Sequence, residues 1–139
     1  MEKLRWIKSF EIGHASIDSQ HRDLMECLNS VINHADEGQG EDAFTACLTM
    51  QSTLRDHLQA EEEILRAARF ERLNRHKESH RHNMRRFSEI VTSCRGACKT
   101  SDSKGCLEEL ARLLIDDFIT GDMDFKSDLK EKGVSRNDP

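Results

Sequence analysis

The sequence predicts an all-α protein, an up-down-up-down antiparallel four-helix bundle that begins with an N-terminal arm. Apolar residues recur at spacings of three and four along four segments, and no segment alternates in the manner of a strand. The connections between the segments are short and polar, and two of them contain glycine. Helices joined by short connections pack as antiparallel neighbours. At 139 residues the chain has the size of one domain.

The first half of the chain contains the arm and two predicted helices. Residues 1–16 form the arm, which has no clear helical period. The first helix is predicted over about 17–37 and ends at a turn marked by Gly38 and Gly40. The second helix is predicted over about 42–68, where leucines line one face.

The second half contains two more predicted helices and a tail. The third helix is expected over about 71–95 and the fourth over about 106–130, with a polar loop between them. Residues 1–132 would then form one domain. The polar residues 133–139 are typical of a linker, and we expect them to lead to a C-terminal output domain.

Composition excludes several classes of function. The net charge of −5 disfavours nucleic acid as a partner, because phosphate-binding domains are usually basic. No apolar run approaches the ~20 residues that cross a bilayer, and the N-terminus has no signal peptide. We therefore expect a soluble, cytoplasmic protein without membrane contact. Five cysteines without a CxxC pair predict reduced thiols, with Cys94 and Cys98 as small buried side chains rather than a redox pair.

Histidine and carboxylate side chains interrupt the apolar stripes of all four predicted helices. The second and third helices each carry a pair of such residues four positions apart. Residues at this spacing lie one above the other on a helix, so each pair can bind one ion or two neighbouring ions. The candidate ligands are His21, His57, Glu61, His76, His80, Asp117 and Asp122.

Counting outward from the turns places these ligands at one level of the bundle. His21 lies 17 residues before Gly38, and His57 lies 17 residues after Gly40. For each of the two other turns, the ligand before the turn and the ligand after it lie at sequence distances from the turn that differ by at most one residue. Burying so many polar groups at one level would be costly unless metal ions pair with them. Imidazole with carboxylate and no thiolate suits iron, manganese or zinc, and Glu61 and Asp122 can bridge two ions.

These residues also occur in motifs that closely resemble those of the hemerythrins, especially the bacterial ones. The motifs are Trp6-x3-Phe10-x2-Gly13-x3-Ile17-Asp18-x-Gln20-His21, His57-x3-Glu61-Glu62 and His76-x3-His80. The resemblance implies a non-haem di-iron centre that binds oxygen, with an oxo, hydroxo or water bridge between two ions that alternate between Fe²⁺ and Fe³⁺. It also implies the ligand assignment: His21 and His57 serve one iron, His76 and His80 serve the other, and Glu61 and Asp122 bridge them.

The fourth helix departs from the family pattern at one position. Asp117 stands where the family has its fifth histidine, whereas Asp122 matches. Asp117 either ligates iron, directly or through water, or is a solvated residue. Because aspartate reaches less far than histidine, we expect an exchangeable position at the iron held by His76 and His80. This departure argues against a stable oxygen carrier and predicts rapid autoxidation and binding of small anions.

Other residues near the motifs are predicted to lie outside the metal site. Glu62 and Glu63 continue an acidic run that we expect to be solvated surface. His14, His34 and His82 have no partner at helical spacing on an apolar stripe. We further expect Trp6 and Phe10 to seal the bundle against bulk water.

The leading functional hypothesis is an oxygen- or redox-sensing domain that regulates a fused signalling output, such as a diguanylate cyclase. Its expected partners are O₂, small anions and the output domain. Two alternatives stay open: a stand-alone oxygen-binding or iron-holding protein, and a di-iron enzyme that acts on peroxide, nitric oxide or oxygen. No catalytic residue is assigned on the sequence.

Overall fold

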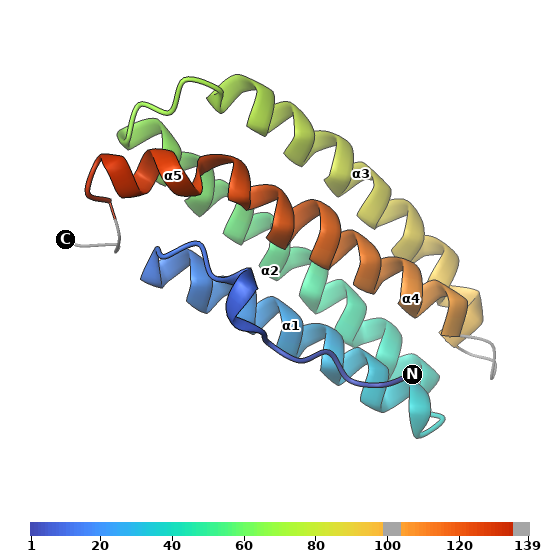
Figure 1. The fold of residues 1–139 in the computed structure, drawn as a ribbon. Coiled ribbons are helices and arrows are strands. Elements are labelled where there is room, and N and C mark those ends of the chain that lie inside the picture. Colours follow the sequence, from blue (N-terminus) through green and yellow to red (C-terminus); the bar gives the residue numbers. More distant parts are fainter. Residues whose placement is uncertain (99–103, 135–139) are drawn as a thin grey trace.

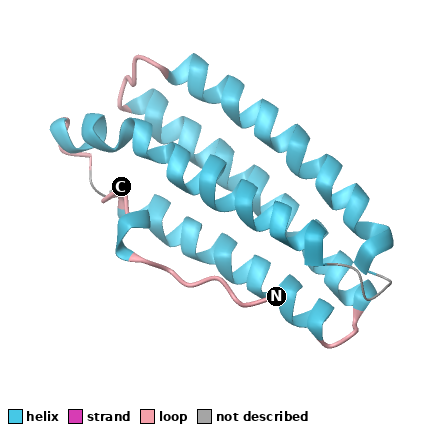
Figure 2. Cartoon of the chain, turned by 45° about the vertical axis from the view of Figure 1, so that its right-hand side comes forward, coloured by secondary structure: helices cyan, strands magenta, loops and turns pink. Residues whose placement is uncertain are grey.

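The computed structural model describes residues 1–98 and 104–134, apart from the side chains of 96–98. Within these ranges the chain forms helices and loops and contains no strand (Figure 2). The first three long helices are α1 (Ala15–Asp36), α2 (Gly40–Ala67) and α3 (Leu73–Cys98), and α4 and α5 lie along the fourth position. Consecutive long helices run in opposite directions along the molecule (Figure 1). The predicted all-α four-helix bundle is confirmed.

Local signals in the sequence define both ends of α1. At its start, the His14 ring accepts a hydrogen bond from the Ile17 backbone N–H, with the two nitrogen atoms 3.3 Å apart. At its end, Gly38 adopts a φ of 75°, a left-handed conformation that suits glycine. The backbone N–H of Gln39 then donates to the carbonyl of His34 and closes the last turn at 2.8 Å. The predicted glycine turn therefore ends the helix as expected.

The fourth position of the bundle is not one continuous α-helix, which differs from the predicted helix over 106–130. The α-helix α4 (Lys104–Arg112) leads into a π-helix η2 (Leu113–Ile119), a 3₁₀ turn η3 (Thr120–Asp122) and the α-helix α5 (Met123–Glu131). Within η2, two pairs of buried residues are five positions apart, beside one pair, Leu114 and Phe118, that is four positions apart. An interval of five matches the i to i+5 hydrogen bonds of a π-helix. The pairs five positions apart are Leu113 with Phe118 and Leu114 with Ile119.

The N-terminal arm lies along α1 (Figure 1). The Leu4 backbone exchanges two hydrogen bonds with the Asn29 side chain, at 2.7 and 3.0 Å. Where the arm meets the start of α1, the Asp18 carboxylate accepts hydrogen bonds from the backbone N–H groups of Ile12 and Gly13, at 2.9 and 3.1 Å. The arm is thus attached to the helix that carries the first predicted ligand.

Two apolar clusters form the core. The larger one spans the part of the bundle that contains Leu28, Met50, Phe87 and Leu110. The smaller one consists of Ile12, Ile17, Leu65, Phe70, Phe125 and Leu129. Along each helix, the predicted histidine and carboxylate ligands fall between residues of one cluster and residues of the other. A polar layer therefore separates the two clusters.

The cysteines differ from their prediction. Cys94 on α3 and Cys106 on α4 form a disulfide, with their Cα atoms 5.6 Å apart. The prediction of reduced thiols was wrong for this pair, because the two cysteines are 12 positions apart in sequence and meet only when α3 packs against α4. The side chain of Cys98 lies outside the described residues.

The predicted loop and tail are described only in part. The helix α3 continues to Cys98 and α4 begins at Lys104, so the predicted polar loop is shorter at both ends. Residues 99–103, and 135–139 of the predicted linker, lie outside the described part of the chain. Among the residues that are described, no helix combines the length and the apolar character that crossing a membrane requires.

Candidate metal centre

Six of the seven predicted ligands meet in the polar layer, and all six are buried. They come from α1, α2, α3 and η3. They form two groups of four, and within each group the ligand atoms lie within 4.8 Å of one another. Two carboxylates belong to both groups. The groups are His21, His57, Glu61 and Asp122, and Glu61, His76, His80 and Asp122.

The Glu61 carboxylate faces one histidine pair with each of its oxygens. Its Oε2 lies 3.0 Å from Nε2 of His57 and 3.8 Å from Nε2 of His21. Its Oε1 lies 2.8 Å from Nε2 of His76 and 3.0 Å from Nε2 of His80. A carboxylate so divided has the placement of a bridge between two ions.

Asp122 divides its oxygens in the same way. Its Oδ2 lies 2.8 Å from Nε2 of His21, and its Oδ1 lies 3.3 Å from Nε2 of His76. Because η3 follows the π-helix directly, the change of helical geometry falls just before this residue.

Several polar atoms at the centre of this cluster have no partner with hydrogen-bond geometry within the described part of the chain, although most of them lie close to an oppositely charged group. They include both ring nitrogens of His21, Oε2 of Glu61 and Oδ2 of Asp122. Leaving buried polar atoms unpaired costs about 1–3 kcal/mol each, so native proteins rarely retain them. Metal ions bound between the histidine nitrogens and the carboxylate oxygens would satisfy Nε2 of His21 and both oxygens. The residues present therefore fit a metal centre.

The carboxylates of the cluster favour positive charge on two of its histidines. Burial alone would lower the pKa of His21, but Asp122 and Glu61 outweigh it and raise that pKa to about 9. The same two carboxylates raise the pKa of His76 to about 10, again against the effect of burial. Burial and the charge of Glu61 raise the pKa of Asp122 to about 6. In the metal-free protein, protons take the place of the cations.

Residues outside the ligand set hold two of the histidines by their outer nitrogens. Nδ1 of His57 lies 2.5 Å from Oε1 of Gln20, and Nδ1 of His80 lies 2.7 Å from Oε2 of Glu62. Such contacts orient the ring so that Nε2 would face a bound metal ion. The prediction that Glu62 is solvated surface was wrong, since its side chain is only 25% exposed and contacts His80. That contact joins residues 18 positions apart and depends on how α2 packs against α3.

Glu63 and His14 also acquire defined roles. Glu63 is solvated as predicted, with its side chain 65% exposed and paired with Arg66. His14, which the sequence left without a helical partner, is buried and caps α1.

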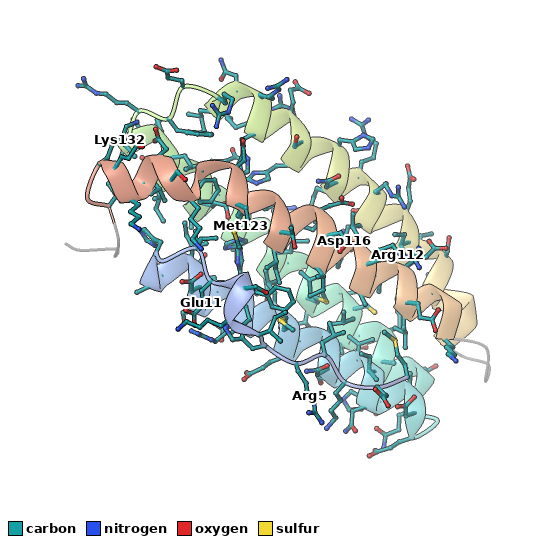
Figure 3. The ribbon with its side chains drawn as sticks, in the orientation of Figure 1. Arg5, Glu11, Arg112, Asp116, Met123 and Lys132 are labelled. Carbon is teal, nitrogen blue, oxygen red and sulfur yellow. A yellow bond between two sulfur atoms is a disulfide. The ribbon has the colours of Figure 1, made fainter. Side chains whose placement is uncertain are left out.

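Asp117 does not join the converging ligand atoms. It is exposed on η2 and lines a pocket of about 410 Å³ whose wall includes His76 and His80. Asp116, labelled in Figure 3, lines the same pocket. A second pocket, of about 360 Å³, borders His57. Ligation by Asp117, directly or through water, stays a prediction.

Comparison with known proteins gives a family match. A model of the hemerythrin HHE cation-binding domain matches residues 13–120, which include five of the six converging ligands. Asp122 lies two residues beyond the matched range. A search of curated proteins found no match. With the family match, the helical bundle and the buried histidine–carboxylate cluster in agreement, the chain belongs to the hemerythrin HHE cation-binding domain family.

Proposed function

We propose that this domain holds two iron ions, reacts with O₂ and senses oxygen or redox state. The observation that carries the proposal is the division of Glu61 and Asp122 between two histidine pairs. Imidazole with shared carboxylates is a donor set that suits iron at two-metal spacing. When bound, the iron pair supplies reversible one-electron oxidation at each ion and reactivity toward O₂.

The residues of the chain position and enclose these ions. Four histidines present Nε2 toward the carboxylates. Apolar residues on both sides of the polar layer, among them Phe125, whose ring lies 5.3 Å from that of His76, exclude bulk water. The pocket beside His76 and His80 gives small molecules a route to one side of the centre.

Rapid autoxidation is the finer part of the proposal. A histidine at position 117 would offer a neutral nitrogen ligand near His76 and His80, whereas Asp117 is an exposed carboxylate that lines the pocket beside them. Oxygen donors, whether from Asp117 or from water, favour Fe³⁺ over Fe²⁺. Small anions would reach the same position. These features support a sensor that is oxidised by O₂ rather than a carrier that keeps it.

The proposal extends to a fused signalling output, such as a diguanylate cyclase, in a cytoplasmic protein. Support comes from the course of the chain, because Asp122 is followed directly by α5, which ends at Glu131. A redox change at Asp122 can alter the C-terminal segment only if that segment interacts differently with the two states.

Oxidation by air tests this function directly. We expect O₂ to oxidise the reduced, iron-loaded protein on the time scale of a stopped-flow mixing experiment. We also expect reduction to change hydrogen exchange in 113–133 more than in α1. A reduced protein that survives prolonged exposure to O₂ would contradict sensing by autoxidation. Equal exchange in both redox states would contradict signal transmission through α5.

One alternative has an observation in its favour. The pocket at His76 and His80 can admit peroxide or nitric oxide, which would suit a di-iron enzyme. Catalytic turnover of either molecule by the iron-loaded domain would support the enzyme, and stoichiometric reaction would support the sensor.

A further inference from the structure

His80 is held at both ring nitrogens by neighbouring residues of α2. Its Nε2 lies 3.0 Å from Oε1 of Glu61, and its Nδ1 lies 2.7 Å from Oε2 of Glu62. Glu61 therefore contacts His80 from inside the candidate metal centre, and Glu62 contacts the same ring from outside it.

The first histidine pair has a neutral counterpart at the matching place. Nδ1 of His57 lies 2.5 Å from Oε1 of Gln20, and Nε2 of Gln20 donates to Oγ of Ser16 at 3.3 Å. The amide therefore presents its oxygen to His57 and its nitrogen away from it. Each histidine thus has an acceptor at Nδ1, but one acceptor is charged and the other is neutral.

This difference has a chemical consequence. A carboxylate that accepts the Nδ1–H of an imidazole makes Nε2 a stronger electron donor than a neutral amide does. A stronger donor binds metal more tightly and stabilises the higher oxidation state. We propose that Glu62 is a positioning residue that makes the two metal positions unequal, by giving the His76–His80 position a stronger donor than Gln20 gives the His21–His57 position. The inference rests on the proposed two-metal centre.

The chain offers a matched set of variants to test it. Glu62→Gln replaces the charge with the amide that His57 already has. Glu63→Gln removes the same charge one position away, from a side chain that is 65% exposed and pairs with Arg66. Gln20→Glu is the mirror change, because it places a carboxylate on Nδ1 of His57.

The test is an anaerobic titration of each metal-free variant with Fe²⁺ and with Co²⁺. Wild type should bind two ions in distinguishable steps. Glu62→Gln should weaken one step by about 10–100-fold, the usual effect of removing such a partner, and Glu63→Gln should leave both steps unchanged. Gln20→Glu should strengthen the weaker step. In the iron-loaded protein, Glu62→Gln should also raise the reduction potential of one iron, by about 59 mV for each tenfold change in the oxidation equilibrium.

A second measurement separates this role from a purely structural one. In the Co²⁺-loaded protein, the exchangeable Nδ1–H protons of the ligand histidines give strongly shifted NMR signals. Glu62→Gln should move one of these signals, and Gln20→Glu should move a different one. A structural contact would change the unfolding temperature of the metal-free protein and leave the potential and the NMR signals in place.

The outcomes distinguish this inference from the proposed function. Two bound ions in wild type, with Glu62→Gln and Glu63→Gln alike in affinity, potential and NMR signals, would overturn the inference alone. Failure of wild type to bind two ions would overturn the proposed function and the inference with it.

Discussion

At the scale of single residues, Asp117 is the one predicted ligand that lies outside the converging cluster. It is exposed and lines the pocket beside His76 and His80, outside the converging ligand atoms. The six other predicted ligands converge in two groups that could each hold a metal ion. The reactivity of the centre should therefore depend strongly on this one position.

Asp117→His should slow autoxidation of the reduced, iron-loaded protein by about tenfold or more, a typical effect of changing the surroundings of a metal ligand. A histidine reaches further from the backbone and supplies a neutral nitrogen that favours Fe²⁺. Stopped-flow absorption after mixing with O₂ measures the rate. Asp116→His, which adds the same side chain at the same pocket, is the control. Equal rates in wild type and both variants would show that Asp117 is not at a ligand position.

The charges of the buried histidines should make the metal-free protein less stable as the pH rises. In the folded state His21 and His76 keep their protons up to pKa values of about 9 and 10, whereas an unfolded histidine loses its proton near 6.5. The folded state therefore binds more protons between these values, and the free energy of unfolding should fall from about pH 6.5 to about pH 10. Denaturant unfolding at a series of pH values, with a chelator present, measures this. A flat profile over that range would contradict the raised pKa values.

At the scale of secondary-structure elements, the fourth position of the bundle is the most irregular. The π-helix η2 accommodates apolar pairs five residues apart, and it lies directly before the turn that carries Asp122. The other notable element is the pair of helices around the Cys94–Cys106 disulfide, which joins α3 to α4. One connection of the bundle is therefore closed covalently.

Reduction of this disulfide, or Cys106→Ser, should lower the free energy of unfolding by about 2–3 kcal/mol, because the open chain gains conformational entropy when unfolded. Denaturant unfolding with and without a reductant measures the change. Cys27→Ser is the control, since Cys27 takes no part in the disulfide. The same loss of stability in Cys27→Ser, or no loss in Cys106→Ser, would contradict a stabilising disulfide.

At the scale of the whole molecule, the candidate metal centre brings together residues from all four positions of the bundle. Its ligands come from α1, α2, α3 and η3, and they lie between two separate apolar clusters. Without ions, several buried atoms of the polar layer have no partner with hydrogen-bond geometry among the described residues. Metal binding should therefore be linked to the stability of the entire fold.

Removal of metal should lower the free energy of unfolding by about 4 kcal/mol relative to protein with free metal at a thousand times its Kd. Thermal unfolding with iron or with a chelator measures the difference, and metal analysis should give two ions per chain. Glu61→Ala removes the carboxylate that faces both histidine pairs, so its unfolding should respond little to metal. An equal response to metal in Glu61→Ala and wild type would place the bound ions elsewhere.

The sequence by itself determined the helices, their approximate ends and the six residues that converge at the candidate metal centre. Apolar spacing and glycine turns are local signals, and helices of similar rise bring His21 and His57 to one level when they pack side by side. The π-helix had a signal in the interval of five between Leu113 and Phe118, but a search for intervals of three and four does not detect it.

Only the tertiary structure decided the Cys94–Cys106 disulfide, the contact of Glu62 with His80 and the exposure of Asp117. Each depends on how far one helix is rotated and shifted against its neighbour. Apolar periodicity defines which face of a helix is buried, but it leaves the residues at the edges of that face undetermined. Side-chain packing between the helices sets the final rotation, which the pattern of a single helix does not contain.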